Sequence, residues 1–213
     1  MKSGIVFALV LVLSAATSCG QRSSAVRAGP FHWNPDNSQE LGGEDRISHL
    51  KTLNPIERER ILDAIVQELK PNKGEVDAHT EHEWNVIAAE TRIKLVDLNG
   101  DGIPEVIAQA SDDQLCSPTG NCSFWVFMRS GKRYKLILDA DARQTFTIQK
   151  SRTNGFLDLV LGMHGSATEE GLFIYRFIKG RYQTSACYDA NWRRLVGNEW
   201  QDLKEPVITP CSR

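Results

Sequence analysis

Excess basic charge and long apolar segments are both missing from the sequence. Lys and Arg number 25 against 27 Asp and Glu, a formal net charge of −2, and no segment gathers basic residues into a patch. A nucleic-acid partner is therefore not expected. The longest apolar run, Ile5 to Leu13, is shorter than the roughly 20 residues that a membrane-spanning helix needs. The sequence thus predicts no transmembrane segment.

Catalytic signatures are equally scarce. The sequence has no phosphate-binding glycine loop, no nucleophile elbow and no CxxC pair. The order His79-Thr80-Glu81-His82 does not match the HExxH arrangement of zinc enzymes, so a solvated loop or a helix end is expected there. His164 or the pair Glu169-Glu170 could display a catalytic group, although such residues are also typical of plain surface loops. Enzymatic activity is left uncertain, and a non-enzymatic role is favoured.

The first eighteen residues are typical of a bacterial signal peptide. Lys2 precedes the apolar run, and small residues follow it up to Ser18. Cleavage after Ser14-Ala15-Ala16 would suit an ordinary signal peptidase. Cleavage before Cys19 would suit lipoprotein processing, because Ala16-Thr17-Ser18-Cys19 resembles the lipobox of bacterial lipoproteins, with Ala16 where that family usually has Leu.

Localisation follows from which of the two cleavages occurs. We expect a protein of the bacterial cell envelope, on the periplasmic or extracellular side, attached to the membrane only through a lipid on Cys19. Without lipidation of Cys19 the chain would be secreted as a soluble protein.

The cysteine count agrees with export. Five cysteines are present, and lipidation of Cys19 would leave an even set of four for disulfides in an oxidising compartment. Four cysteines permit three pairings, and their separation along the chain favours Cys116 with Cys122 and Cys187 with Cys211. Both bonds are expected to be structural, the first closing a turn-rich loop and the second holding the C-terminal tail.

Composition divides the remaining chain into a flexible tether, residues 19–45, and a single β-rich domain, residues 46–213. The tether is rich in Ser, Gly, Asn and Gln and shows little apolar periodicity. The first element expected in the domain is a helix over residues 54–70, because Asn54 can cap it and Pro55 fits its first position. One face of this helix is apolar and should pack on a core: Ile61, Leu62, Ile65, Val66 and Leu69.

From residue 91 onward, short β-branched and aromatic runs alternate with turn residues, which predicts an antiparallel meander. Strands are expected over 92–97, 105–110, 123–128, 134–139, 145–150, 156–161, 172–177 and 182–187. Two repeats are suggested, at about 91–140 and 145–187, since residues 102–107 and 155–160 are alike and each is followed by a hairpin. A weaker third hairpin, Trp192 to Trp200, lies in the C-terminal hairpin and tail, 188–213.

The most specific chemical signal is the run from Asp97 to Glu105. Its alternate side chains and one carbonyl can converge on a cation that prefers six to eight oxygen ligands, as calcium does. Gly102 stands at loop position six, where the chain must turn sharply. The expected metal ligands are Asp97, Asn99, Asp101, Glu105 and the backbone carbonyl of Ile103. The alternative is an Asp/Asn/Gly turn that holds no metal, which the same residues could also form.

The same residues resemble the FG-GAP and VCBS-type repeats of integrin-like β-propellers, in which such a loop joins two strands of a blade. The resemblance covers Arg92 to Tyr134 well and Lys150 to Tyr182 poorly, since Lys150, Arg152 and Asn154 stand where the second copy would have ligands. It implies one structural calcium ion. A closed propeller is not expected, because the chain has room for only two or three blades.

The fold class predicted is therefore mainly β: an antiparallel meander of two or three blade-like repeats with one N-terminal amphipathic helix packed on it. The function expected is a calcium-stabilised binding or interaction module whose partner is an envelope protein or a glycan. A periplasmic hydrolase, or an inhibitor of a cell-wall-degrading enzyme, remains the alternative. Ligand, partner and oligomeric state cannot be read from these residues.

Overall fold

The computed structural model describes residues 31, 33, 37–51, 53–70, 79–111, 115–143 and 145–211. The expected signal peptide and Cys19 lie outside these residues. No helix in the described part of the chain is both long and apolar enough to cross a membrane.

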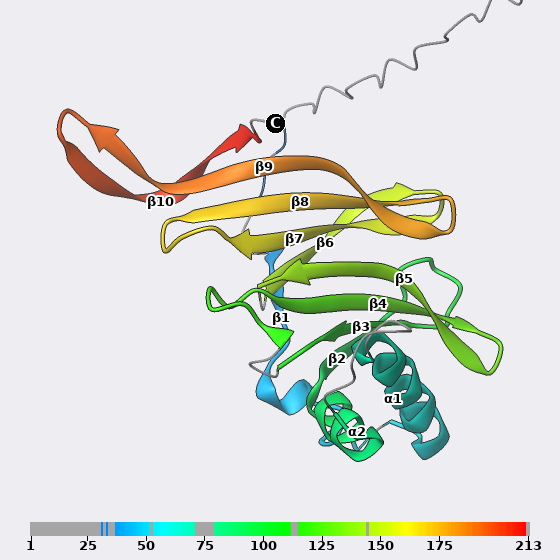
Figure 1. Cartoon of the computed structure of the whole chain (residues 1–213). Coiled ribbons are helices and arrows are strands. Elements are labelled where there is room, and N and C mark those ends of the chain that lie inside the picture. The colour runs from blue at the N-terminus through cyan, green and yellow to red at the C-terminus, as the bar shows by residue number, and fades with distance from the viewer. Residues whose placement is uncertain are drawn as a thin grey trace, which may run out of the picture.

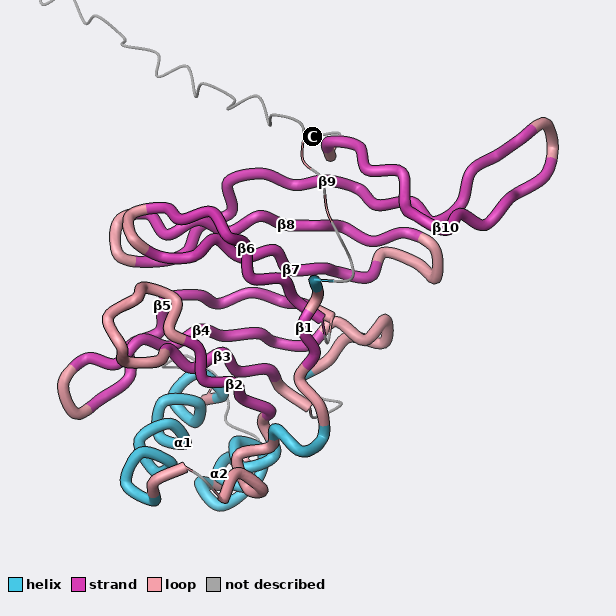
Figure 2. The backbone as a smooth tube through the Cα atoms, turned by 180° about the vertical axis from the view of Figure 1, so that it is seen from behind, coloured by secondary structure: helices cyan, strands magenta, loops and turns pink. Residues whose placement is uncertain are grey.

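Two antiparallel sheets, two α-helices and one short 3-10 helix, Gly43–Asp45, make up the described part of the fold, and neither sheet closes on itself (Figures 1 and 2). The four-stranded sheet consists, in this order, of β2 (Arg92–Val96), β3 (Glu105–Gln109), β4 (Cys122–Ser130) and β5 (Arg133–Ala142). The six-stranded sheet consists, in this order, of β1 (Gln39–Glu40), β6 (Thr145–Thr153), β7 (Phe156–His164), β8 (Glu169–Ile178), β9 (Arg181–Val196) and β10 (Glu199–Pro210). The predicted mainly-β meander is confirmed.

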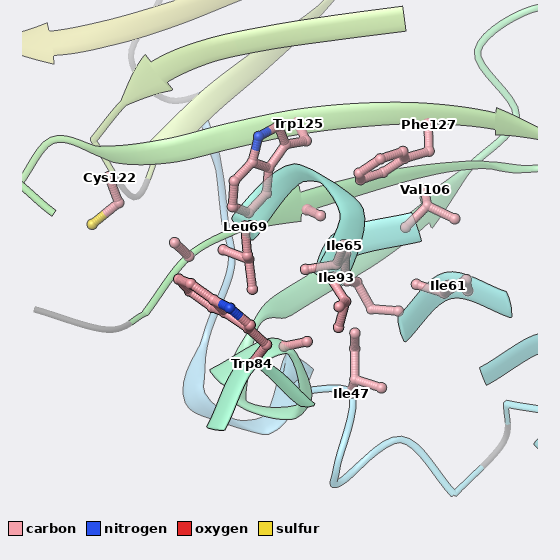
Figure 3. Packing of buried hydrophobic residues seen from close by; sticks show 14 of the residues in the cluster. Ile47, Ile61, Ile65, Leu69, Trp84, Ile93, Val106, Cys122, Trp125 and Phe127 are labelled. Atoms are coloured by element: carbon pink, nitrogen blue, oxygen red, sulfur yellow. The ribbon is translucent and has the colours of Figure 1, made fainter. Parts of the chain in front are cut away.

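The predicted helix is α1 (Pro55–Leu69), with the expected start. The Asn54 side chain accepts a hydrogen bond from the Ile56 N–H at 2.9 Å, so the cap supplies a partner for an amide that the helix leaves unpaired. The apolar face of α1 packs on one face of the four-stranded sheet, and Figure 3 shows helical side chains gathered under Trp125 and Phe127 of β4.

A second helix, α2 (Glu81–Glu90), lies where the sequence pattern predicts only a solvated loop or a helix end. Thr80 and Glu83 form a capping box: the Thr80 hydroxyl accepts from the Glu83 N–H at 3.3 Å, and the Glu83 carboxylate accepts from the Thr80 N–H at 2.6 Å. Trp84 and Ala88 then bury against the same core as α1. The Thr-x-x-Glu spacing is the signal that reveals this helix.

The opposite face of the four-stranded sheet packs on the six-stranded sheet. Phe124 of β4 lies against Phe146 of β6, with ring centroids 5.5 Å apart, and both side chains are fully buried. Within the second sheet, the rings of Phe156 and Phe177 stack with their centroids 3.7 Å apart. A cluster that draws side chains from both sheets therefore joins the two halves of the domain.

Each half contains a four-stranded meander, β2 to β5 and β6 to β9. The third hairpin does form, but as an extension of the second sheet. Pairing of β8 with β9 ends at Glu169 opposite Asn191, and beyond it the segment from Arg193 to Asp202 pairs only with itself. This two-stranded ribbon, called the arm below, projects from the domain (Figure 1).

Candidate metal loop and the adjoining groove

The predicted metal loop connects β2 to β3, and the two strands close it by pairing Val96 with Glu105. Gly100 and Gly102 both have φ near +82°, in the left-handed region that a Cβ disfavours. The glycine expected at loop position six therefore occupies a conformation that needs glycine, as does a second glycine two residues earlier.

Side chains of the loop accept hydrogen bonds from the amides of the loop itself. The Asp97 carboxylate accepts from the N–H groups of Gly100 at 2.6 Å and Gly102 at 3.0 Å. Asn99 Oδ1 accepts from the Asp101 N–H at 2.8 Å, and Asp101 Oδ1 accepts from the Ile103 N–H at 2.7 Å. These local bonds hold the loop in shape.

Asn99 draws two of the expected ligands together. Its side-chain amide donates to Asp101 Oδ2 at 3.0 Å and to Glu105 Oε1 at 3.1 Å. The structure thus brings Asn99, Asp101 and Glu105 into direct contact, whereas Asp97 bonds to the loop glycines on either side of Asp101.

Glu105 is the buried member of the loop, with 2% of its surface exposed. Burial raises the pKa of its carboxyl group, and the nearby negative charges of Asp101 and Asp97 raise it further, against the lowering effect of a bond from the Leu98 N–H. The pKa of Asp97 is lowered, chiefly by the hydrogen bond from the Gly102 N–H.

The donor set of this loop fits calcium in kind. It consists of oxygen atoms only, and its carboxylates form no salt bridge to a cationic side chain of the described residues. A bound cation would offset the repulsion from Asp101 and Asp97 that adds to the effect of burial on the pKa of Glu105. In the described part of the chain, no group of three or more His, Cys, Asp or Glu side chains is arranged to hold a metal ion, so the ligand set remains a prediction.

The loop also joins the two sheets. Leu98 is fully buried, and its carbonyl accepts from the Leu157 N–H at 2.8 Å and from Arg152 Nη1 at 3.1 Å. Arg152 donates as well to the Gly155 carbonyl at 2.6 Å. Arg152 is one of three residues that stand where the expected second copy would have ligands, and here it hydrogen-bonds to the metal loop. Sequence reasoning missed this contact between distant segments.

A groove of about 430 Å³ lies beside the loop, at the N-terminal end of α1. Ile103 and Pro104 of the loop form part of its wall, and the exposed side chains of Ile56 and Leu95 add to it. Its polar residues are Asn54, Glu57, Arg60, Arg129 and Tyr134.

Glu57 is the centre of these polar contacts. Tyr134 donates its hydroxyl proton to Glu57 Oε1, Arg60 Nη1 lies 3.2 Å from Glu57 Oε2, and Arg129 Nε lies 3.9 Å from Glu57 Oε1. Burial and the bond to Glu57 raise the pKa of Tyr134. One carboxylate is therefore shared by two guanidinium groups and a phenol.

A second polar cluster lies where β7 ends and β8 begins. The sequence around Glu170 is typical of a surface loop, yet this residue lies on β8 and only 4% of it is exposed. Arg143 Nε lies 2.8 Å from Glu170 Oε1, and Arg143 Nη1 lies 3.4 Å from His164 Nε2. Burial raises the pKa of Glu170 to about 7, against the lowering effect of Arg143. His164 is exposed, and its Nδ1 lies 3.2 Å from the Thr119 carbonyl.

The favoured cysteine pairs are the ones present. Cys116 is bonded to Cys122 and Cys187 to Cys211, across sequence separations of 6 and 24 residues. Both pairs are consistent with an oxidising compartment.

Comparison with known proteins yields no matching family model, no matching curated protein and no matching solved structure. The resemblance to FG-GAP and VCBS-type repeats therefore rests on the loop residues alone.

Proposed function

We propose that this chain is an exported protein of the bacterial envelope, lipid-anchored at Cys19, that acts as a calcium-stabilised binding or interaction module. One observation carries the proposal. A single loop supplies all the oxygen donors of the expected calcium site, borders an open groove, and bonds through Leu98 to the other sheet. Order in this loop would therefore affect both the stability of the domain and the surface it presents.

Calcium would act here as a structural ion. Its charge offsets the repulsion among Asp97, Asp101 and Glu105, and it would rigidify a turn that like charges otherwise strain. A weak affinity, on the order of 10⁻⁴ to 10⁻³ M, suits extracellular calcium modules. The two disulfides support an oxidising, exported location.

The test compares melting temperatures of the chain with calcium and with a chelator. Calcium should raise the melting temperature of the wild type and leave that of Asp97→Asn unchanged, because the amide of this variant lacks the charge of the first ligand. Asp141→Asn is the matched control, since Asp141 is an exposed carboxylate outside the loop. It should respond to calcium as the wild type does. Equal calcium responses of the wild type and Asp97→Asn would refute the site.

A periplasmic hydrolase is the second candidate, and the Glu170 cluster is the observation that favours it. A carboxyl group with a pKa of about 7 can donate and accept protons near neutral pH. His164 contacts Arg143, the arginine that also pairs with Glu170. The hydrolase hypothesis predicts turnover of a wall-derived substrate that is lost in His164→Ala without loss of fold. The binding-module hypothesis predicts no turnover in either protein.

A further inference from the structure

We propose that the groove beside the metal loop, together with a basic hollow that adjoins it, binds an acidic peptide segment that carries apolar side chains. This inference rests on the proposed binding function and deepens it by naming the class of ligand and its place on the surface.

The apolar part of the surface is the first argument. Three large apolar side chains that remain exposed to solvent line this groove. The exposed fractions are 60% for Ile56, 42% for Leu95 and 45% for Ile103. They come from α1, β2 and the metal loop, so they are neighbours only in the folded chain. Exposed apolar residues that gather in a hollow rimmed by polar groups are typical of a recognition surface.

The charge of the surface is the second argument. A hollow of about 570 Å³ adjoins the groove and shares Arg60 and Tyr134 with it. Across the two hollows the basic residues are Arg60, Arg129, Lys132 and Arg133, and the acidic residues are Glu57 and Asp63. Four cations against two carboxylates give a local excess of positive charge on a chain whose net charge is −2. An anionic ligand would complement this surface.

Hydrogen-bonding capacity points the same way. Glu57 already accepts from the Tyr134 hydroxyl and pairs with both Arg60 and Arg129. Two guanidinium groups that share one carboxylate retain donors for a second carboxylate, and a guanidinium binds a carboxylate with two parallel hydrogen bonds.

The apolar wall selects a peptide over an anionic glycan. Sugar rings pack their C–H faces best on aromatic rings, and Tyr134 is the one aromatic residue among the described residues that line the groove. An aliphatic wall of Ile56, Leu95 and Ile103 instead matches the side chains of Leu or Val in an extended segment, next to the carboxylates of Glu or Asp.

Calcium would affect peptide binding because the metal loop forms part of the groove wall. If the proposed calcium function holds, the ion fixes Ile103 and Pro104, and peptide binding should strengthen when calcium is present. If calcium has no effect on stability, peptide binding should be the same with calcium and with a chelator.

The experiment measures fluorescence anisotropy of two labelled probes with the purified full chain. The first probe is acetyl-Glu-Leu-Glu-Glu-Leu-Glu-amide, and the second has Lys in place of each Glu. The acidic probe should bind at least about tenfold more tightly than the basic one, and its affinity should fall as salt rises. Equal affinities for the two probes, or no binding of either, would overturn the proposal.

Variants locate the site and control for charge and hydrophobicity. Arg129→Gln and Arg133→Gln should each weaken binding of the acidic probe at least about threefold, as should Leu95→Ser and Ile103→Ser. Lys150→Gln removes a positive charge from β6, and Val86→Ser removes an exposed apolar side chain from α2; neither should change the affinity. Circular dichroism establishes that each variant is folded. Equal losses in groove and control variants would also overturn the proposal.

A polyanionic glycan, heparin, tests the competing ligand class. Displacement of the acidic probe by heparin that is insensitive to Leu95→Ser would assign the surface to anionic glycans and contradict the peptide assignment. The calcium response of the melting temperature is measured on the same samples. If calcium raises the melting temperature but neither peptide binds, the calcium site is supported and the peptide-binding proposal is refuted.

Discussion

The Leu98 carbonyl accepts a hydrogen bond from the Leu157 N–H at 2.8 Å, and this bond crosses from the metal loop of the first sheet to β7 of the second. The Leu98 N–H meanwhile donates to Glu105 Oε2 at 2.8 Å. One peptide segment therefore connects the most buried carboxylate of the loop to the other half of the domain. Substitutions in the loop should therefore weaken the association of the two sheets.

Arg152 tests this connection directly. Arg152→Met keeps much of the aliphatic stem but removes the donors to the carbonyls of Leu98 and Gly155. The free energy of unfolding should fall by about 1.5 to 3 kcal/mol, the range for hydrogen bonds that involve a charged group. Urea unfolding measures it. Lys150→Met, a change of the same kind at an exposed position on the same strand, should cost much less, and equal costs would contradict the role of Arg152.

The turn between β8 and β9 offers a stabilising change. Lys179 has φ of 52° and Gly180 has φ of 81°, so both central residues of this two-residue hairpin are left-handed, as type I′ turns require. The corresponding turn between β6 and β7 has Asn154 at the first position. Lys179→Asn should raise the free energy of unfolding by about 0.5 to 1 kcal/mol, because Asn tolerates this conformation better than Lys.

The control for this change is Lys132→Asn in the turn between β4 and β5. Lys132 follows Gly131 and is not among the residues with positive φ, so Asn gains nothing there. A rise in the melting temperature of both variants by the same amount would show that a general effect of charge, rather than turn conformation, is responsible.

The arm should open locally without unfolding the domain. Its cross-strand pair Leu195 and Trp200 is exposed by 56% and 65%, and its strands have no third partner among the described residues. A lone two-stranded ribbon is marginally stable in water. Amides of residues 193–202 should therefore exchange with deuterium much faster than those of β7, as measured by mass spectrometry. Comparable protection of the two segments would show that the arm is covered in solution.

Sequence patterns predicted the parts of the fold that rest on local rules. Alternating apolar residues and turn glycines located the eight strands from β2 to β9, and the cap at Asn54 located α1. The sequence predicted the hairpin at the tip of β9 and β10. It did not predict β1 or the continued pairing of Val207 to Pro210 with β9, because both depend on edges that only the assembled sheet provides. Local spacing contains no information about such partners.

In the candidate site, too, local features could be predicted and contacts between distant segments could not. The turn at Gly102 was predicted from its place in the motif. The hydrogen bonds that Asn99 and Asp101 accept from loop amides were not predicted, although they too depend only on residues of the loop. The contact of Arg152 with Leu98 spans 54 residues and had no local signal. The groove could not be predicted either, since its wall combines residues from α1, β2 and the loop.

Glu170 gives the protein a predicted dependence of stability on pH. Its folded pKa of about 7 lies above the value of 4.5 for an unperturbed Glu, because burial disfavours the carboxylate. The folded state therefore holds this proton more tightly than the unfolded state does. The resulting stabilisation is complete below about pH 4.5 and is lost as pH rises through about 7.

The measurement is the difference in unfolding free energy between the wild type and Glu170→Gln at pH 5 and pH 8. The side-chain amide of this variant cannot ionise, so the wild type should lose about 1 to 3 kcal/mol relative to the variant over this range. Glu169→Gln, at the neighbouring exposed position, should follow the wild type. A constant difference between wild type and Glu170→Gln would show that Arg143, 2.8 Å away, keeps the carboxylate ionised in the folded chain. In that case the cluster would lack the proton donor that the hydrolase hypothesis requires.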